Sequence, residues 1–143
     1  PPRIYRCRGT AGEFSRIAGL IGEFRQTSHK SLGIICRDEA HALILYERFR
    51  EQYNDIFFLS HLSTAYVNGI IVTSAHMAKG LEFDVVLLAG VDQYDLSNAS
   101  HINRLYVGIT RARQNLVLLS GTKTLAPQLA EVRAVYQDLA GRP

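Results

Sequence analysis

The hydrophobic residues of the chain form short runs separated by polar and glycine-containing segments, a pattern that predicts strands. The runs cover residues 4–8, 32–36, 56–59, 69–74, 84–90 and 115–120. Two of them, GIIVTS at 69–74 and DVVLLAG at 84–90, are almost wholly apolar. Strands of that kind are covered on both faces, as they are in a parallel sheet.

Between the runs, apolar residues recur at intervals of three and four, which predicts helices. The four stripes are Phe14, Ile17, Ile21 and Phe24; Ala42, Leu45, Phe49 and Tyr53; Ile102, Leu105, Tyr106 and Ile109; and Leu129, Val132, Tyr136 and Leu139. Thr10 and Glu13 have the spacing of a capping box at the start of the first helix. Asp38 is expected to cap the second helix. The third helix is expected over residues 100–111, with Tyr106 facing the core.

This alternation of strands and helices predicts an α/β fold with a doubly wound, mostly parallel sheet flanked by helices. A chain of 143 residues suits one domain over residues 1–143. Ligands of such folds bind at the carboxyl ends of the strands. The loops after Cys36, Ser74 and Gly90 are therefore the expected place for a site.

Composition narrows the class of protein. Hydrophobic residues make up 47% and charged residues 20%, which excludes a largely disordered chain. The longest apolar run, residues 85–91, is too short to cross a membrane, and no signal-peptide pattern is present, so no membrane association is expected. Cys7 and Cys36 lack metal-type spacing, which favours reduced thiols and a cytoplasmic location. Because the chain begins at Pro1 and contains one methionine, it is interpreted as a piece of a longer protein.

The net charge is +3, and arginine supplies 13 of the 16 basic residues. Arginine is suited to bidentate contact with phosphate, although an arginine-biased surface explains the composition equally well. Arg3, Arg6 and Arg8 lie close together and could face nucleic acid, but a solvated strand near a domain boundary has the same pattern. Direct readout of bases is not predicted.

Several chemistries are not indicated by the sequence. It has no G-x-x-x-x-G-K-[ST] loop, no G-x-G-x-x-G after a strand, no H-E-x-x-H and no paired-cysteine motif. The five histidines are scattered, so no metal site is predicted.

Polar residues gather in the segment IVTSAHMAKGLEFDVV at 71–86, which reads as strand, polar turn and strand. Ser74 and His76 follow the end of the first strand. Lys79 and Gly80 form a small basic turn where backbone can approach a ligand. Glu82 then supplies a carboxylate that suits a sugar hydroxyl.

A second polar segment, NRLYVGITRARQNL at 103–116, reads as a helix that presents Thr110, Arg111 and Arg113 at its carboxyl end. The helix dipole favours cations at that position. Capping of the helix, or simple solvation, is therefore the alternative to a ligand-binding role for these arginines.

The strings VTSAHMAKGLEFDVV and RLYVGITRAR resemble motifs V and VI of the UvrD/Rep-like superfamily 1 helicases, and GIICR at 33–37 resembles motif IV. Members of this family are ATPases with two RecA-like motor domains. The resemblance covers residues 32–120. It implies that the chain is the second motor domain, a P-loop NTPase-type fold without its own P-loop. Walker A and Walker B would lie in a first, N-terminal motor domain that this chain lacks.

The resemblance also implies an ATP site, with Mg²⁺, in the cleft between the two motor domains. Arg111 would be the arginine finger, and Arg37 would be a second contact to the γ-phosphate. Gly80 and Glu82 would line the nucleotide, with Glu82 on the ribose side. The chain alone is then not expected to hydrolyse ATP.

The partner implied on the other side of the site is single-stranded DNA. By the resemblance, Ser74 and His76 would face the strand. Lys79 is a candidate for contact with phosphate, and a solvated side chain is the equal alternative. Candidates for base stacking are Phe57, Phe58, Tyr66 and Tyr94.

Two departures from the family pattern bear on function. Cys36 replaces an aromatic residue that often stacks on adenine, and only 33 residues separate Arg37 from Ile71. That compactness is similar to the helicase IV/HelD-like branch, some of whose members act on RNA polymerase. Three functions stay open: a DNA helicase or translocase, an ATP-driven RNA polymerase-remodelling factor, and a non-catalytic binding module.

Overall fold

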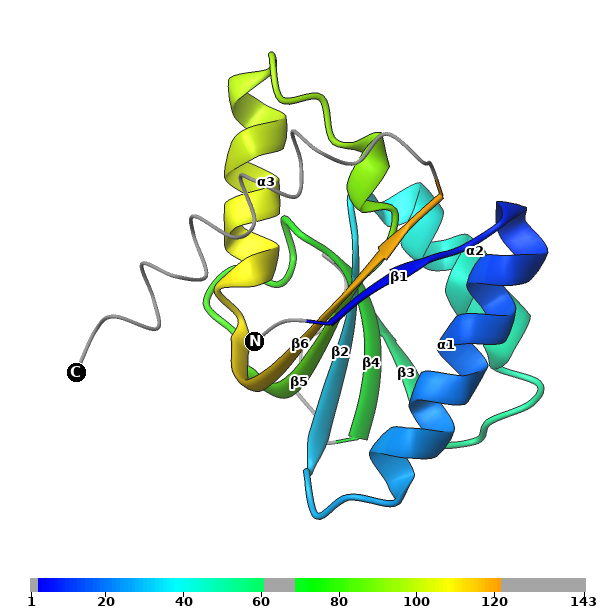
Figure 1. Cartoon of the computed structure of the whole chain (residues 1–143). Helices are drawn as coiled ribbons and strands as arrows, with labels where there is room; N and C mark the ends of the chain where they lie inside the picture. The colour runs from blue at the N-terminus through cyan, green and yellow to red at the C-terminus, as the bar shows by residue number, and fades with distance from the viewer. Residues whose placement is uncertain (1–2, 61–68, 122–143) are drawn as a thin grey trace.

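The computed structural model describes residues 3–60 and 69–121 of the chain (Figure 1). Its elements, in order, are β1 (Arg3–Arg6), α1 (Gly9–Arg25), β2 (Ser31–Cys36), α2 (Glu39–Phe49), β3 (Ile56–Leu59), β4 (Gly69–Ser74), β5 (Phe83–Leu88), the 3₁₀ turn η1 (Val91–Gln93), α3 (Ala99–Ile109) and β6 (Ala112–Ser120). The six strands form one sheet in the order β1-β6-β5-β2-β4-β3. Every neighbouring pair is parallel, which confirms the predicted α/β fold.

Helices cover both faces of this sheet (Figure 1). Buried residues of α1 and α2, including Ile17 and Leu45, pack on one face. Leu105 and Ile109 of α3 pack on the other face, together with Ala75 and Ala78 from the turn after β4. The sheet is therefore doubly wound. Each of the six residues of β2 is buried, as expected for a central strand.

Gly33 of β2 is required by packing rather than by backbone conformation. A Cβ atom built on Gly33 would lie 2.6 Å from the ring of Phe83, the first residue of β5. Real Cβ atoms do not approach a ring so closely. The ring of Phe83, which is fully buried, therefore fills the space that any side chain at position 33 would need.

The two helix starts behave differently from each other. Asp38 caps α2 as predicted, because its carboxylate accepts a hydrogen bond from the backbone N–H of His41 at 2.9 Å. The predicted capping box of α1 is wrong. Arg8 is the N-cap of that helix, with no side-chain hydrogen bond, and Glu13 instead contacts Nε2 of His41 at 3.0 Å. A tertiary partner thus replaces the local one.

The carboxyl end of α3 also differs from its prediction. The helix ends at Ile109, with Thr110 as its C-cap, and Arg113 belongs to β6 rather than to the helix end. Tyr106 is 43% exposed, so the prediction that it faces the core is wrong. The apolar stripe is wider than the surface that the sheet covers, so its outer edge stays exposed. The fourth predicted helix, with Leu129, Val132, Tyr136 and Leu139, lies outside the described residues.

Both cysteines lie within the described residues. Cys7 and Cys36 are free and buried, as predicted. Burial raises the pKa of the Cys36 thiol, so this side chain stays protonated and packs as a small apolar group. None of the helices in the described part of the chain combines the length and apolarity that a membrane crossing requires.

Loss of the α2 cap should weaken the fold measurably. We expect Asp38→Ala to lower the free energy of unfolding by about 0.5–2 kcal/mol, the usual effect of removing such a cap. The hydrogen bond from the His41 N–H and the contact with Arg37 hold the pKa of Asp38 below its usual value. The ionised Asp38 carboxylate therefore contributes its full stabilisation above the unfolded-state pKa of about 4. This stabilisation is lost as the pH falls through the lower folded-state pKa.

Urea unfolding of wild type and Asp38→Ala at pH 7 and at acidic pH measures this effect. The difference between them should shrink as the pH falls. Asp38→Asn serves as the control, because asparagine keeps the cap without the titrating group. An unchanged stability of Asp38→Ala at pH 7 would contradict the capping role.

Candidate functional site

The predicted site residues fall at two opposite edges of the sheet. Because the strands are parallel, their carboxyl ends share one edge. Arg37 follows β2 and Ser74 ends β4 at that carboxyl edge. Arg111 precedes β6, and Glu82 precedes β5, at the amino edge. The turn at residues 75–82 connects the two edges.

At the carboxyl edge, a hollow of about 340 Å³ opens between β2, β4 and α3. Its lining residues are Arg37, Asp38, Glu39, Ser74, His76, Met77 and Arg104. The hydroxyl of Ser74 is buried and accepts a hydrogen bond from the Met77 N–H at 3.3 Å, so it orders the turn. His76 is exposed at the mouth. The lining carries two guanidinium groups and an imidazole beside the carboxylates of Asp38 and Glu39, so its basic groups are offset by acidic ones.

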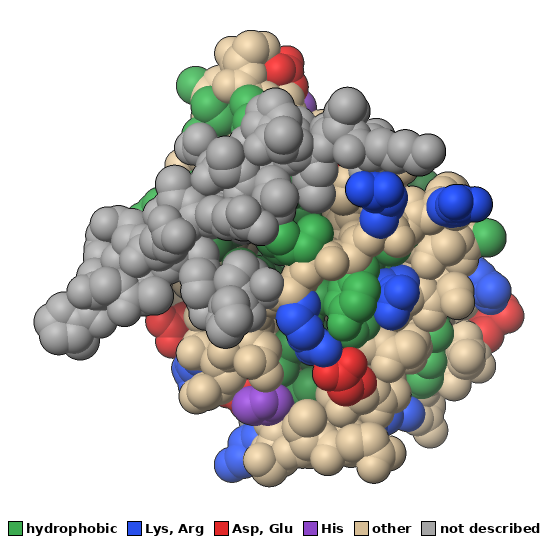
Figure 2. Space-filling view, viewed as in Figure 1, with side chains coloured by type: hydrophobic (Ala, Val, Ile, Leu, Met, Phe, Trp, Pro, Cys, Tyr) green, Lys and Arg blue, Asp and Glu red, His purple; other side chains and the backbone are tan. Residues whose placement is uncertain are grey.

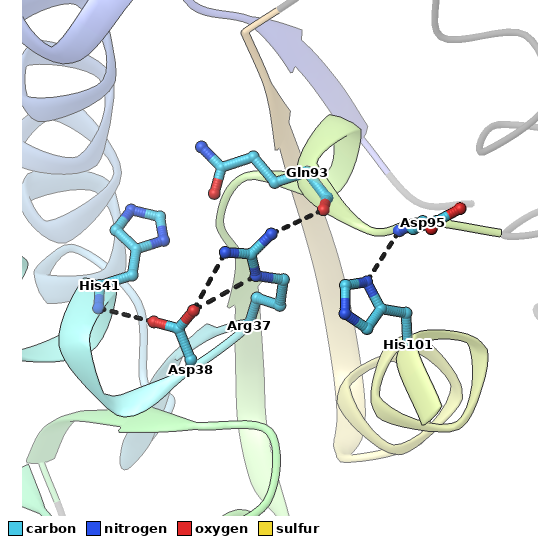
Figure 3. Close-up of polar contacts among 6 residues, drawn as sticks. All are labelled: Arg37, Asp38, His41, Gln93, Asp95 and His101. Atoms are coloured by element: carbon cyan, nitrogen blue, oxygen red, sulfur yellow. Dashed lines mark hydrogen bonds and ion pairs between the residues drawn. The ribbon is translucent and has the colours of Figure 1, made fainter. Parts of the chain in front are cut away.

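Arg37 is held at this edge by contacts on both sides (Figure 3). Its guanidinium donates to Oδ2 of Asp38, at 3.3 Å from Nε and 3.1 Å from Nη2. Its Nη1 donates to the carbonyl oxygen of Gln93 at 2.9 Å. The loop after β5, which contains Gln93, thus fixes the orientation of Arg37.

At the amino edge, Arg111 folds back against its own domain. Its Nη1 donates to the carbonyl oxygen of Leu81 at 3.3 Å, and its Nη2 donates to the hydroxyl of Thr110 at 3.1 Å. Its backbone carbonyl accepts from the N–H of Phe83 at 2.9 Å. The Nε atom is buried and has no hydrogen-bond partner among the described residues. The guanidinium therefore has donor capacity left for a further acceptor.

Glu82 lies beside Arg111 at the same edge. Its carboxylate accepts from Nε of Arg113 at 3.0 Å, and both side chains are more than half exposed. Lys79 and Gly80 are also exposed. Gly80 has a φ of +84°, a left-handed conformation that glycine adopts without strain, and no atom lies within 4 Å of a Cβ built there. The turn can therefore present bare backbone to a ligand.

The geometry does not bring Arg37 and Arg111 together. Ile35 pairs with Leu88, and Phe83 pairs with Ala112. With about 3.3 Å per residue along a strand, the two arginines lie roughly 25 Å apart. That both contact one γ-phosphate stays a prediction. The order of the predicted elements already indicates this arrangement, since Arg37 follows the predicted strand at 32–36 and Arg111 precedes the one at 115–120.

The aromatic candidates for base stacking differ in how they are packed and exposed. Tyr94 is 1% exposed and packs edge to face with His101, so it is a core residue and the prediction for it is wrong. Phe58 packs on the ring of Tyr46. Phe57 stays 42% exposed on β3. Tyr66 lies outside the described residues.

Arg104 and Gln93 were not singled out from the sequence. Arg104 lies in the amino-terminal half of α3, the helix that follows β5. A helix that follows a parallel strand starts at the carboxyl edge, so topology could have placed Arg104 beside Ser74. Gln93 acts through its backbone carbonyl, which leaves no signal in the sequence. Within residues 3–60 and 69–121, no group of three or more potential ligands could hold a metal ion.

The same segments that form this site match a known family. Residues 69–119 match the model of the UvrD-like helicase C-terminal domain. The match covers somewhat more than a third of the chain. A stretch of 72 residues is 31% identical to the RecBCD enzyme subunit RecB of Chlamydia pneumoniae, covering 49% of this chain and 7% of that subunit. The chain therefore spans a small part of the length of its curated relative.

Solved structures of helicase domains share the fold. The C-terminal domain of a possible DNA helicase from Lactobacillus plantarum has a TM-score of 0.76 at 20% identity, covering 94% of this chain and 82% of that one. The C-terminal domain of the DEAD-box protein Dbp5 has a TM-score of 0.66 at 15% identity, covering 96% and 85%. The chain thus shares the α/β fold of these helicase C-terminal domains. Its membership of the helicase IV/HelD-like branch stays a prediction.

Proposed function

We propose that this helicase domain is the second motor domain of an ATP-dependent DNA helicase or translocase. One observation carries the proposal. Arg111 donates a hydrogen bond to the carbonyl oxygen of Leu81, and this contact between the two polar segments supports the proposed pairing of a finger with a nucleotide-binding turn. Both motifs lie within the part of the chain that matches the family.

On the ATP side, we assign the nucleotide to the amino edge of the sheet. Arg111 would stabilise the negative charge that develops on the transferred phosphoryl group. Glu82 would accept a hydrogen bond from a ribose hydroxyl, and the backbone at Gly80 would approach the nucleotide. Bound ATP supplies the phosphoryl group and Mg²⁺ neutralises charge on it. Since the described residues offer no metal-binding group, Mg²⁺ would be held by the first motor domain.

On the nucleic-acid side, we assign a DNA strand to the hollow at the carboxyl edge. His76 and Arg104 at its mouth supply donors for phosphate oxygens, and Lys79 lies exposed farther along the turn. Ser74 contributes by ordering the turn. Arg37 joins this group, since its guanidinium lines the same hollow and lies far from Arg111. These contacts are to backbone, so they tolerate any base sequence, as a tracking motor requires.

The two sides are joined by the turn at residues 75–82. Ala75 and Ala78 are buried under it against the sheet, so the turn moves with the domain rather than independently. Closure of the ATP cleft would then carry the DNA-contacting residues along as one body.

ATP hydrolysis assays test the proposal. The 143-residue chain alone should show no turnover, because the finger acts on a nucleotide that the first motor domain binds. The longer protein containing that domain should hydrolyse ATP faster when single-stranded DNA is added. Steady hydrolysis by the isolated chain, or no response of the longer protein to DNA, would contradict the motor assignment.

A further inference from the structure

The charge of the chain is unevenly distributed. Residues 1–30 carry a net charge of +4, and the remaining 113 residues carry a net charge of −1. The whole positive excess therefore lies in β1, α1 and their flanking residues. None of these residues belongs to the motifs that carry the proposed function.

The structure gathers four of these arginines along one margin of the molecule, which we call the arginine edge: Arg3, Arg6, Arg8 and Arg16. Among the described residues, β1 is the last strand of the sheet, so one side of it has no strand partner there. Figure 2 shows basic side chains over β1 and α1, on the face turned toward the viewer. Arg3, Arg6, Arg8 and Arg16 are all exposed.

These arginines are held to different degrees. Arg3 pairs with Glu23 at 2.7 Å, and the guanidinium of Arg16 lies over the ring of Tyr5, 4.2 Å from its centroid. The guanidinium groups of Arg6 and Arg8 make no hydrogen bond or ion pair with any described residue, although the Arg8 carbonyl accepts from the Gly12 N–H. Arg3 and Arg16 are thus held in place. The guanidinium groups of Arg6 and Arg8 each have five N–H donors available.

We propose that the arginine edge binds the phosphate backbone of duplex DNA. Arginine in this arrangement complements phosphate by charge and by hydrogen-bond geometry. Duplex DNA is favoured over a single strand because single-strand surfaces use aromatic rings on which bases stack. The one aromatic ring of this edge, that of Tyr5, is covered by Arg16. A surface that offers guanidinium groups and no open ring suits a ligand whose bases are already paired.

The arginine edge is separate from the proposed single-strand site. β1 and β4 are separated by β6, β5 and β2, which is four strand spacings. At about 4.8 Å per spacing, the two surfaces are roughly 19 Å apart across the sheet. Binding at the edge needs neither ATP nor the first motor domain, so the inference does not rest on the proposed motor function.

Fluorescence anisotropy with a fluorescein-labelled 20-base-pair duplex and a labelled 20-nucleotide single strand tests the inference. The 143-residue chain is titrated at several KCl concentrations. We expect Arg6→Ala/Arg8→Ala to weaken duplex binding by about fivefold or more at low salt. We also expect it to lower the slope of log Kd against log[KCl] by about 2, since two phosphate contacts are lost.

Two matched variants complete the test. Arg48→Ala/Arg50→Ala removes the same charge from α2 and should change duplex binding by less than about twofold. Arg6→Lys/Arg8→Lys keeps the charge and should retain most of the affinity and the wild-type slope. Circular dichroism melting checks that each variant folds.

Three results would overturn the proposal. Duplex binding by Arg6→Ala/Arg8→Ala could equal that of wild type at every salt concentration. The α2 variant could weaken binding as much, which would mean that net charge alone governs it. Alternatively, only single-strand binding could be lost, which would assign the edge to single-stranded DNA.

Discussion

Replacing Arg111 with alanine should lower ATP turnover of the longer protein by about 10³- to 10⁵-fold, the usual effect of removing an arginine finger. In the proposed role, the guanidinium would stabilise charge present only in the transition state, so kcat should fall while ATP binding is largely retained. Steady-state kinetics with single-stranded DNA, together with nucleotide binding measured separately, would distinguish these two effects.

Two further variants sharpen this expectation. Arg111→Lys keeps the charge but loses the planar fork of donors, so it should recover only part of the activity. Arg50→Ala, on α2 and paired with Glu47, removes the same charge far from the site and should leave kcat unchanged. Wild-type turnover of Arg111→Ala would mean that another group serves as the finger.

Truncating Phe83 should have the largest effect on stability. We expect Phe83→Ala to lower the free energy of unfolding by about 3–5 kcal/mol, since a fully buried ring is replaced by a cavity at the start of β5. The adjacent Arg111 carbonyl, which accepts the Phe83 N–H, links this packing to the position of the finger. Urea unfolding followed by circular dichroism would measure the loss.

The contact with Gly33 gives this prediction an internal check. Gly33→Ala alone should cost about 1–3 kcal/mol, because the added methyl would overlap the Phe83 ring. Combined with Phe83→Ala, the same methyl enters the vacated space. The double variant should therefore be more stable than the sum of the single changes predicts. Strict additivity of the two losses would contradict close packing of Gly33 against the Phe83 ring.

The sheet could be predicted from the sequence because its strands are covered on both faces. The runs at 69–74 and 84–90 have no polar face, so few other structures suit them, and they form β4 and β5. Local capping was harder to predict. Asp38 caps its helix, but Glu13 binds His41 from another helix, a partner 28 positions away. Such contacts depend on the assembled fold, which local spacing does not contain.

The site was predicted in part for the same reason. Ser74 and His76 could be placed at the carboxyl edge because they follow a recognisable strand. Arg111 was expected at the end of a helix, and a helix that joins two parallel strands runs back to the amino edge. The separation of Arg37 from Arg111 follows from that direction. Only its size required the strand register.

The turn between β4 and β5 limits which deletions this part of the chain can accept. It descends roughly 20 Å from the carboxyl edge to the amino edge, judged from the strand register at about 3.3 Å per residue. Eight residues cover this descent, and three backbone hydrogen bonds shorten their reach: Ala78 to Ser74, Lys79 to His76 and Leu81 to Ala78. The segment therefore has little length to spare beyond the distance that it must span. Substitutions in this segment can be absorbed one side chain at a time, whereas a deletion would pull β5 out of register. Length, more than composition, is therefore what restricts evolutionary change between residues 75 and 82.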